Sequence, residues 1–257
     1  MRIALLSDIH GNLVALNAVL DDLRQQGAID QIIVAGDLAW SGPWPAQVVD
    51  RVREVATAVV QGNTDAFFRH RSGETPSGKD DDRFASHLAW MIERLGPERV
   101  DFLATLPFSW RVSPSPGDDL LVVHANPSDL ERPIPPHLAE EDLDELLMGD
   151  DGHQPDWQAL AFGHLHAPYV RHWQGRLLVD VASAGLPMDG DQRAAYAILT
   201  WDGHQRWQAE HRRVFYPVPV VAYEMRTCGM PRGKHFAERL VAANYGRPLQ
   251  TLAMFSG

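Results

Sequence analysis

RIALLSDIHGN, residues 2–12, opens the chain with a short apolar run that ends in a cluster of polar side chains. The run, residues 2–7, has the length and composition of a buried β-strand. Asp8 and His10 follow it directly, and residues 12–26 then carry apolar side chains at helical spacing up to Gly27. A strand, a turn and a helix in this order predict a βα unit with reactive side chains at the carboxyl end of its strand.

Two further units of the same kind follow along the chain. Residues 31–35 form an apolar run that ends at Gly36-Asp37, and residues 57–61 form another that ends at Gly62-Asn63. A helix is predicted between them, over residues 45–56. Because repeated βα units build a parallel sheet, the three strand ends are expected to meet at one edge of it.

The rest of the chain has a different texture. Residues 71–82 are polar and predict a loop, whereas 83–106 have helical periodicity. We therefore expect a domain over 1–213, with 66–106 as a helical cover of the site, and a C-terminal extension over 214–257 whose role the sequence does not define. A helix is predicted at 138–148 and a single one in the extension, at 235–244. Short β-like runs lie at 108–112, 120–124, 159–162, 169–173, 177–181, 195–201 and 205–212.

Composition limits the classes of protein to consider. The 257 residues, 45% of them hydrophobic, suit one large α/β domain. The single cysteine, Cys228, rules out an intramolecular disulfide framework and favours a reducing compartment. No apolar run reaches the length of about 18 residues that a membrane helix needs, and the N-terminal run is too short for a signal peptide. We expect a cytoplasmic protein without membrane contact.

Charge limits the partners. The formal net charge of -11 disfavours binding to duplex nucleic acid. It does not exclude a small phosphorylated substrate, because bound cations can invert the local field of an acidic site. The sequence leaves open whether the protein forms a homo-oligomer.

Polar side chains of the types that bind metals follow five of the predicted strands. These candidate ligands are Asp8, His10, Asp37, Asn63, His124, His164 and His166. Carboxylate and imidazole ligands without thiolate favour Mn, Fe, Zn, Ni or Co over a structural cysteine-rich zinc site. A shared carboxylate can bridge two ions about 3.5–4 Å apart, which is the spacing of two-metal hydrolytic sites.

Five segments resemble, in chain order, the sequence blocks of the calcineurin-like metallophosphoesterase superfamily. They are SDIHGN (7–12), GD (36–37), GNTD (62–65), VHANP (123–127) and GHLH (163–166). The segments GDLAWSGPWP (36–45) and SAGLPMDGDQRAAY (183–196) are most similar to the small bacterial and archaeal phosphodiesterase branch. The resemblance covers about residues 1–213.

The resemblance implies a four-layer αββα sandwich of two mixed sheets flanked by helices, with the site at its apex. It implies two divalent metal ions, with Mn preferred and Fe, Zn, Ni, Co or Mg as alternatives. The first ion takes Asp8, His10 and His166, and the second takes Asn63, His124 and His164. Asp37 bridges them, and a hydroxide between the ions attacks phosphorus in line.

One departure from the family concerns proton transfer. Many members have a histidine after the Gly-Asn of the third block, whereas this chain has Thr64. A hydroxyl can contact a phosphate oxygen but is a poor general acid at neutral pH. Either a metal-bound water or Asp65 supplies the proton, or the leaving group needs little help. The phosphodiesterase branch also lacks that histidine.

Simpler roles compete with each functional one. Asp8 and Asn12 could be helix caps, and Asp37 and Asn63 could be turn residues. Asn12 and Thr64 are nevertheless the candidate substrate contacts beside the bridging Asp37. Aromatic residues could line a pocket or fill the core; these are Trp40, Trp44, Phe67 and Phe68. The remaining histidines fit no block and are interpreted as surface or structural: His70, His87, His137, His153, His172, His204, His211 and His235.

The function expected from the sequence is therefore a metal-dependent phosphoesterase, and a phosphodiesterase in particular. A phosphomonoesterase or protein phosphatase on the same site is the first alternative. A non-catalytic metal-binding interaction scaffold is the second, and it belongs to another functional class.

Overall fold

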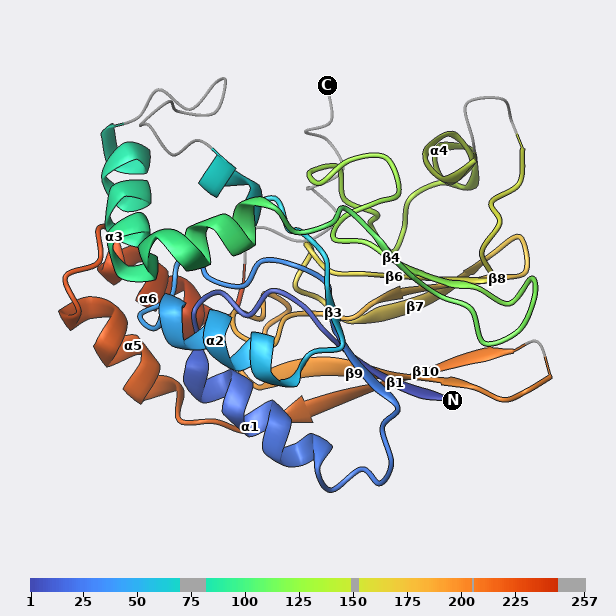
Figure 1. The fold of residues 1–257 in the computed structure, drawn as a ribbon, viewed down its shortest axis with the longest axis horizontal. Helices are drawn as coiled ribbons and strands as arrows, with labels where there is room; N and C mark the ends of the chain where they lie inside the picture. The colour runs from blue at the N-terminus through green and yellow to red at the C-terminus, as the bar shows by residue number, and fades with distance from the viewer. Residues whose placement is uncertain (70–81, 149–152, 205, 245–257) are drawn as a thin grey trace.

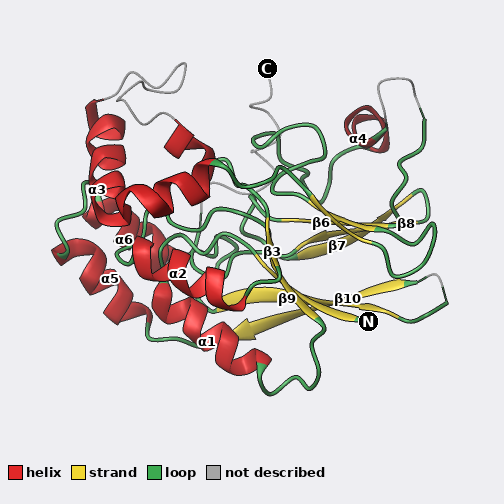
Figure 2. Ribbon diagram, in the orientation of Figure 1, coloured by secondary structure: helices red, strands yellow, loops and turns green. Residues whose placement is uncertain are grey.

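The structure is a computed structural model that describes residues 1–69, 82–148, 153–204 and 206–244. Two five-stranded sheets lie against each other, and helices cover their outer faces (Figures 1 and 2). This is the predicted four-layer arrangement of two mixed sheets flanked by helices. Among the described residues, no helix combines the length and apolar character needed to cross a bilayer.

The first sheet has the strand order β10-β9-β1-β2-β3. Its strands are β1 (Arg2–Leu6), β2 (Gln31–Val34), β3 (Ala58–Val59), β9 (Ala194–Trp201) and β10 (Trp207–Val214). β1 pairs in parallel with β2, and β2 with β3, whereas β9 runs antiparallel to β1 and to β10. The three predicted βα strands therefore lie side by side and point the same way.

The second sheet has the order β4-β5-β6-β8-β7. Its strands are β4 (Trp110–Val112), β5 (Leu120–Val122), β6 (Ala159–Phe162), β7 (Tyr169–Trp173) and β8 (Arg176–Asp180). β5, β6 and β8 are parallel, and β4 and β7 are antiparallel edges. The helices are α1 (Leu13–Leu23), α2 (Pro45–Val55), the short 3-10 helix η1 (Asp65–Arg69), α3 (Asp82–Ala104), α4 (Glu140–Leu147), α5 (Val218–Thr227) and α6 (Gly233–Ala242).

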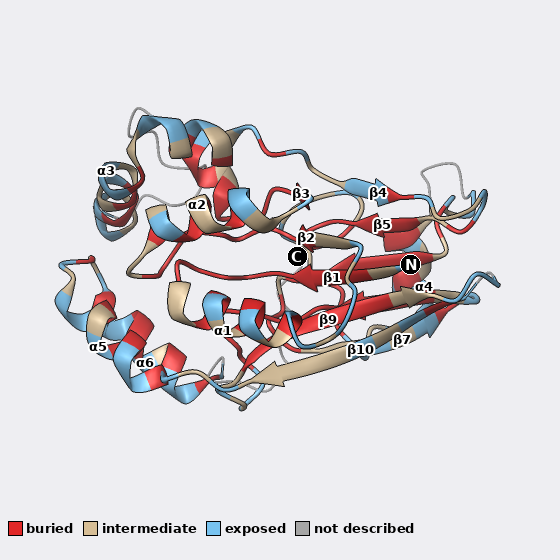
Figure 3. Ribbon diagram, turned by 60° about the horizontal axis from the view of Figure 1, so that its bottom comes forward, coloured by how far each residue is buried: buried red, intermediate tan, exposed pale blue. Residues whose placement is uncertain are grey.

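The core forms the layers that the strand pattern requires. Successive side chains of a strand point to opposite faces, so Ile3 and Leu5 of β1 pack between the two sheets while Ala4 and Leu6 pack under the helices. α4 covers the outer face of the second sheet through a separate apolar cluster. Both faces of β1 are buried (Figure 3). The alternation fixes the strand register and therefore the position of the residues that follow each strand.

One prediction about the helices is confirmed and one was wrong. α3 provides the helix predicted over 83–106, and it has a kink where Gly96 has φ 72° and Pro97 follows it. The described part of the C-terminal extension contains two helices, α5 and α6, not one. The sequence signal for α5 was obscured because its first turn contains Pro219, although a proline is tolerated there. The predicted loop at 71–82 lies outside the described residues except for Asp82.

α5 and α6 pack on each other and on the body of the domain. Their buried side chains form one apolar cluster with Leu186 and Met188, from the loop after β8. The extension therefore reaches back to the same edge of the sheets as the predicted ligands, and α6 lies near α3 (Figure 1).

Candidate metal centre

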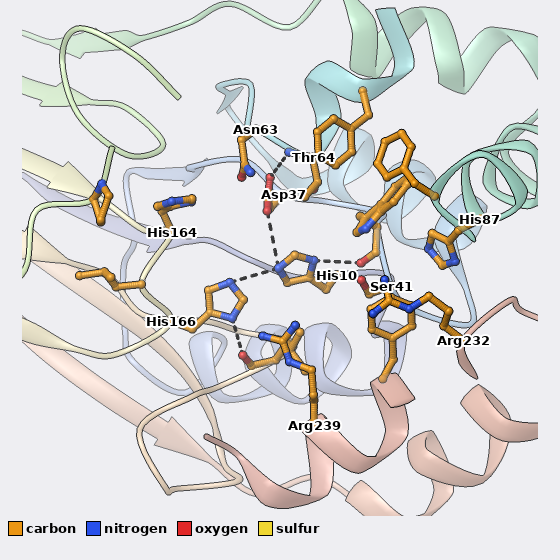
Figure 4. Close-up of a pocket in the computed structure, with 17 residues that line it drawn as sticks. His10, Asp37, Ser41, Asn63, Thr64, His87, His164, His166, Arg232 and Arg239 are labelled. Atoms are coloured by element: carbon orange, nitrogen blue, oxygen red, sulfur yellow. Dashed lines mark hydrogen bonds and ion pairs between the residues drawn. The ribbon is translucent and has the colours of Figure 1, made fainter. Parts of the chain in front are cut away.

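The seven candidate ligands come together at one edge of the two sheets. Figure 4 labels the ones that line the cavity, which are His10, Asp37, Asn63, His164 and His166. In the first sheet, Asp8 and His10 follow β1, Asp37 follows β2 and Asn63 follows β3. In the second sheet, His124 follows β5, and His164 and His166 follow β6. Strands that run parallel present their carboxyl ends at the same edge, which explains how residues 156 positions apart come into contact.

The first group consists of Asp8, His10 and His166. The His166 Nε2 atom lies 3.2 Å from Asp8 Oδ1 and 3.2 Å from His10 Nε2. His10 Nε2 lies 3.8 Å from Asp8 Oδ1. All three residues are buried, and their ligand atoms lie close enough together to hold one ion.

The second group surrounds His124. Its Nε2 atom lies 3.0 Å from Asn63 Oδ1, 3.3 Å from His164 Nδ1 and 3.6 Å from Asp37 Oδ1. The other carboxylate oxygen of Asp37, Oδ2, lies 3.6 Å from His10 Nε2. Asp37 thus presents one oxygen to each group, which is the arrangement required of a bridging ligand.

Hydrogen bonds fix which ring nitrogen faces the centre. Backbone carbonyls can only accept hydrogen bonds, so the Nδ1 atoms of the histidines that contact them carry the protons. His10 Nδ1 donates to the Trp40 carbonyl at 2.9 Å, and His166 Nδ1 donates to the Leu186 carbonyl at 2.5 Å. In the neutral rings, both Nε2 atoms therefore direct lone pairs to the centre. Carbonyl partners of this kind orient metal-binding histidines.

The first group contains a buried carboxylate oxygen without a hydrogen-bond partner. This atom is Asp8 Oδ1, and near it the Nε2 atoms of His10 and His166 lie 3.2 Å apart. A buried acceptor that lacks a donor costs about 1–3 kcal/mol. A cation between these atoms removes that cost, so the donor set fits a divalent ion with carboxylate and imidazole ligands.

The pKa values favour the metal-binding forms. Burial lowers the pKa of His10 and of His164 to about 4, so both rings are neutral at pH 7. Burial opposes ionisation of Asp8, but His166 and the neighbouring histidines outweigh it and hold its pKa well below the usual range. For His124, burial acts to lower the pKa, but the charges of Asp37 and Asp8 raise it overall.

The backbone around the ligands is strained. Five of the seven candidates have positive φ angles, between 48° and 69°: Asp8, His10, Asp37, His164 and His166. Such angles are uncommon outside glycine and cluster at functional sites. Close approach adds a second constraint, because a Cβ atom on Gly163 would lie 2.1 Å from Ser7 Oγ and 2.5 Å from Asp8 Oδ2. Only glycine lets the β6 turn approach Asp8 this closely.

Asp65 has a role that the sequence analysis did not predict. Its side chain is fully buried and accepts backbone N–H bonds from Asp37, Leu38 and Gly62, at 2.8, 3.1 and 3.0 Å. It therefore ties the turn after β2 to the turn after β3. With both oxygens bonded to the backbone, Asp65 is not placed to protonate a leaving group, and that alternative was wrong.

The two remaining catalytic candidates lie at or near the centre. Asn12 is fully buried; its side chain caps α1 by accepting from the Ala15 N–H and donates to the Gly185 carbonyl. This is the capping alternative. Because both the oxygen and the nitrogen of the Asn12 amide are bonded within the protein, the predicted substrate contact by Asn12 is corrected.

Thr64 lines the cavity, and its N–H donates to Asp37 Oδ1 at 3.0 Å. Thr64 thus orients the bridging carboxylate, while its hydroxyl contact with phosphate stays a prediction.

A cavity of about 640 Å³ opens beside the ligands. Trp40 and Phe67 line it, as one of the sequence alternatives expected. Trp44 and Phe68 do not line it, and all four aromatic residues also pack in the apolar clusters, which was the other alternative. Residues that the sequence analysis did not assign to the site also line it, and His87, Arg232 and Arg239 are the basic ones among them. No sequence block marks them, and α6 approaches the cavity only through tertiary packing.

Comparisons with known proteins agree with this geometry. A family model described as the calcineurin-like phosphoesterase superfamily domain matches residues 1–204. An uncharacterized protein of Methanocaldococcus jannaschii is 29% identical over 237 residues, which are 86% of this chain and 90% of that protein.

Solved structures show the same fold. A metallophosphoesterase from Sphaerobacter thermophilus is 28% identical, with a TM-score of 0.74 over 95% of this chain and 99% of that chain. A hypothetical protein from Pyrococcus horikoshii has a TM-score of 0.78 at 17% identity, over 95% of this chain and 98% of that one. The second likeness is one of fold alone.

Proposed function

This chain belongs to the calcineurin-like phosphoesterase superfamily, and on that premise we propose that it is a metal-dependent phosphodiesterase acting on a small phosphorylated substrate in the cytoplasm. The observation that carries the proposal is the first ligand group, in which Asp8 Oδ1 is buried without a hydrogen-bond partner and lies 3.2 Å from the Nε2 atom of His166. Phosphoesterase chemistry at a cluster of carboxylates and imidazoles requires cations to neutralise the phosphate.

The residues divide into two proposed ligand sets. Asp8, His10 and His166 hold one divalent ion. The other ion takes Asn63, His124 and His164, and Asp37 is shared by both, with one oxygen facing each set. When bound, such ions supply a Lewis acid and lower the pKa of water so that it can attack phosphorus at neutral pH.

The chain itself contributes position and proton states. The carbonyl partners of His10, His124 and His166 hold each ring in one orientation. Thr64 and Asp65 fix the bridging turn through backbone hydrogen bonds. The cavity beside the ligands gives room for a second ester group, and Thr64 replaces the histidine of many family members, so we favour a diester over a monoester.

The experiment compares two substrates and one pair of variants. After chelation and reconstitution with Mn²⁺, the native protein is expected to hydrolyse bis-p-nitrophenyl phosphate faster than p-nitrophenyl phosphate. Asp37→Ala is expected to lose bound metal and activity together, because both ions lose a ligand. Asp21→Ala is the matched control, since Asp21 is exposed on α1 and, among the residues that the structure describes, its carboxylate pairs with Arg24 alone.

Each outcome separates one alternative. Faster hydrolysis of the monoester would favour the phosphomonoesterase or protein phosphatase. Metal binding without turnover of any phosphoester would favour the interaction scaffold. A fully metallated and active Asp37→Ala variant would refute the bridging role, and activity that survives exhaustive chelation would refute metal dependence.

A further inference from the structure

The wall of the cavity opposite the ligands is aromatic. Trp40, Phe67 and Phe84 lie in mutual contact, with ring centroids 5.0–5.4 Å apart, and all three line the cavity. Phe236 of α6 lines the same space. Trp40, Phe67 and Phe236 are buried, whereas Phe84 is partly exposed. Phe84 therefore offers a face on which a planar group can stack, and the other rings hold it in place.

Two arginines add positive charge to this wall: Arg232, which immediately precedes α6, and Arg239, within α6. Arg232 and Arg239 both line the cavity, and in Figure 4 they extend from α6 toward His10 and His166. The Arg232 guanidinium lies 5.4 Å from the centroid of the Phe236 ring. Within the described part of the chain, Arg232 forms no ion pair with a carboxylate, although the chain has 34 acidic residues against 23 basic ones. An accessible arginine of this kind suits an anion.

His87 fixes this wall to the rest of the site. Its Nδ1 atom contacts the Pro231 carbonyl at 3.1 Å, one residue before Arg232. Its ring lies 4.4 Å from the Trp40 ring and 5.1 Å from the Phe236 ring. The start of α6 is therefore held against the aromatic residues, so rings and arginines form one surface.

We propose that this surface recognises the second ester group of the substrate, and that this group is a nucleotide. Its base stacks on Phe84, and a further phosphate, distinct from the one hydrolysed, pairs with Arg232 and Arg239. Stacking with cationic guanidinium groups is the chemistry by which proteins bind bases and phosphates. The inference rests on the proposed phosphodiesterase activity, but the arginines lie beyond residue 204, where the family match ends.

The anion site is tested with two substrates that differ by one phosphate. The Mn²⁺-loaded protein is given the dithymidine dinucleotide with or without a 5′-terminal phosphate. The native protein is expected to show a kcat/KM about tenfold higher for the phosphorylated form, equivalent to about 1.4 kcal/mol. In the Arg232→Gln/Arg239→Gln variant this preference should fall to within about twofold. Arg226→Gln, an exposed arginine on α5 that does not line the cavity, should retain it.

Binding provides a readout that does not depend on turnover. Titration calorimetry with 5′-AMP and with pyrophosphate separates the contribution of base stacking from that of the arginine charges, because pyrophosphate has no base. Phe84→Leu should weaken 5′-AMP binding about tenfold and leave pyrophosphate binding unchanged, whereas the double arginine variant should weaken both.

The outcomes distinguish this inference from the proposed function. If the native protein hydrolyses bis-p-nitrophenyl phosphate but shows no preference for the phosphorylated dinucleotide, or if the preference survives the double substitution, the inference fails and the phosphodiesterase proposal stands. If no phosphoester is hydrolysed, the proposed function fails, and unchanged 5′-AMP binding in the arginine variants would overturn the inference as well.

Discussion

Replacing Asp8 with asparagine exchanges one oxygen for an amide nitrogen at the centre of the first ligand group. Asp8 Oδ2 accepts the His164 N–H at 2.9 Å, and an asparagine oxygen can keep this bond. The new Nδ2 group then takes the place of Oδ1, 3.2 Å from His166 Nε2. A donor replaces an acceptor that has no partner, so we expect Asp8→Asn to stabilise the metal-free protein.

The size of the effect follows from the two changes. Removing a buried acceptor without a partner recovers about 1–3 kcal/mol, and a new hydrogen bond adds about 1 kcal/mol. The sum, about 2–4 kcal/mol, corresponds to a rise in Tm of about 4–16 °C for a domain of this size. The same substitution removes a carboxylate from the metal, so stabilisation by Mn²⁺ should be largely lost. In the native protein that stabilisation is about 2.7 kcal/mol when free metal exceeds its Kd a hundredfold.

The assay is thermal unfolding at pH 8, in EDTA and in Mn²⁺. The expected result is a crossover: Asp8→Asn melts higher than the native protein in EDTA and lower in Mn²⁺. Asp22→Asn is the control, because Asp22 is bonded to Arg212 and Tyr196 away from the site. It should melt lower in both conditions and retain the shift caused by Mn²⁺. A lower Tm for Asp8→Asn in EDTA would refute the idea that Asp8 Oδ1 is a destabilising, unpartnered acceptor. An unchanged rise of Tm with Mn²⁺ would refute its role as a metal ligand.

Two further predictions concern buried groups around the site. Asp65→Asn should cost about 1–3 kcal/mol, because an amide can accept only part of its three backbone N–H bonds; it should also weaken Mn²⁺ binding, and urea unfolding with metal titration measures both. Burial lowers the pKa of His87 to about 4, so below pH 6.5 the unfolded chain binds this proton first and stability falls. His87→Asn should therefore reduce the loss of stability on acidification from pH 6.5 to 4 by about 1.4 kcal/mol per pH unit, and identical slopes would contradict this.

The sequence predicts the sheets better than the helices that cover them. Each strand of the first three βα units ends within two residues of its predicted end, because an apolar run followed by a polar turn has few other interpretations. α5 was missed because proline weakens its local signal, and its stability comes from packing with α6. The kink at Gly96 was missed because helical periodicity continues on both sides of it.

The site also contains residues that the sequence predicts and residues that it does not. Candidate ligands are predictable because each follows a strand, and parallel strands bring their ends together whatever lies between. Capping of α1 by Asn12 was one of the alternatives that the sequence offered. The role of Asp65 was not predicted, because a buried side chain bonded to the backbone looks in the sequence like any polar turn residue. Arg232 and Arg239 reach the cavity from a distant helix that no motif marks.

The strained turns after β1 and β2 hold the candidate ligands in position through backbone hydrogen bonds, independently of any bound ion. The Asp8 N–H donates to the Gly36 carbonyl at 3.1 Å, and the His10 N–H donates to the Asp37 carbonyl at 3.0 Å. These bonds lock two left-handed turns together, and such conformations persist only where surrounding structure over-determines them. Ligand residues held in this way keep their metal-binding atoms close together when metal is removed. The stabilisation expected for Asp8→Asn depends on this rigidity. If the ligand residues could move apart in the metal-free protein, Asp8 Oδ1 could find another partner and the amide would bring no gain.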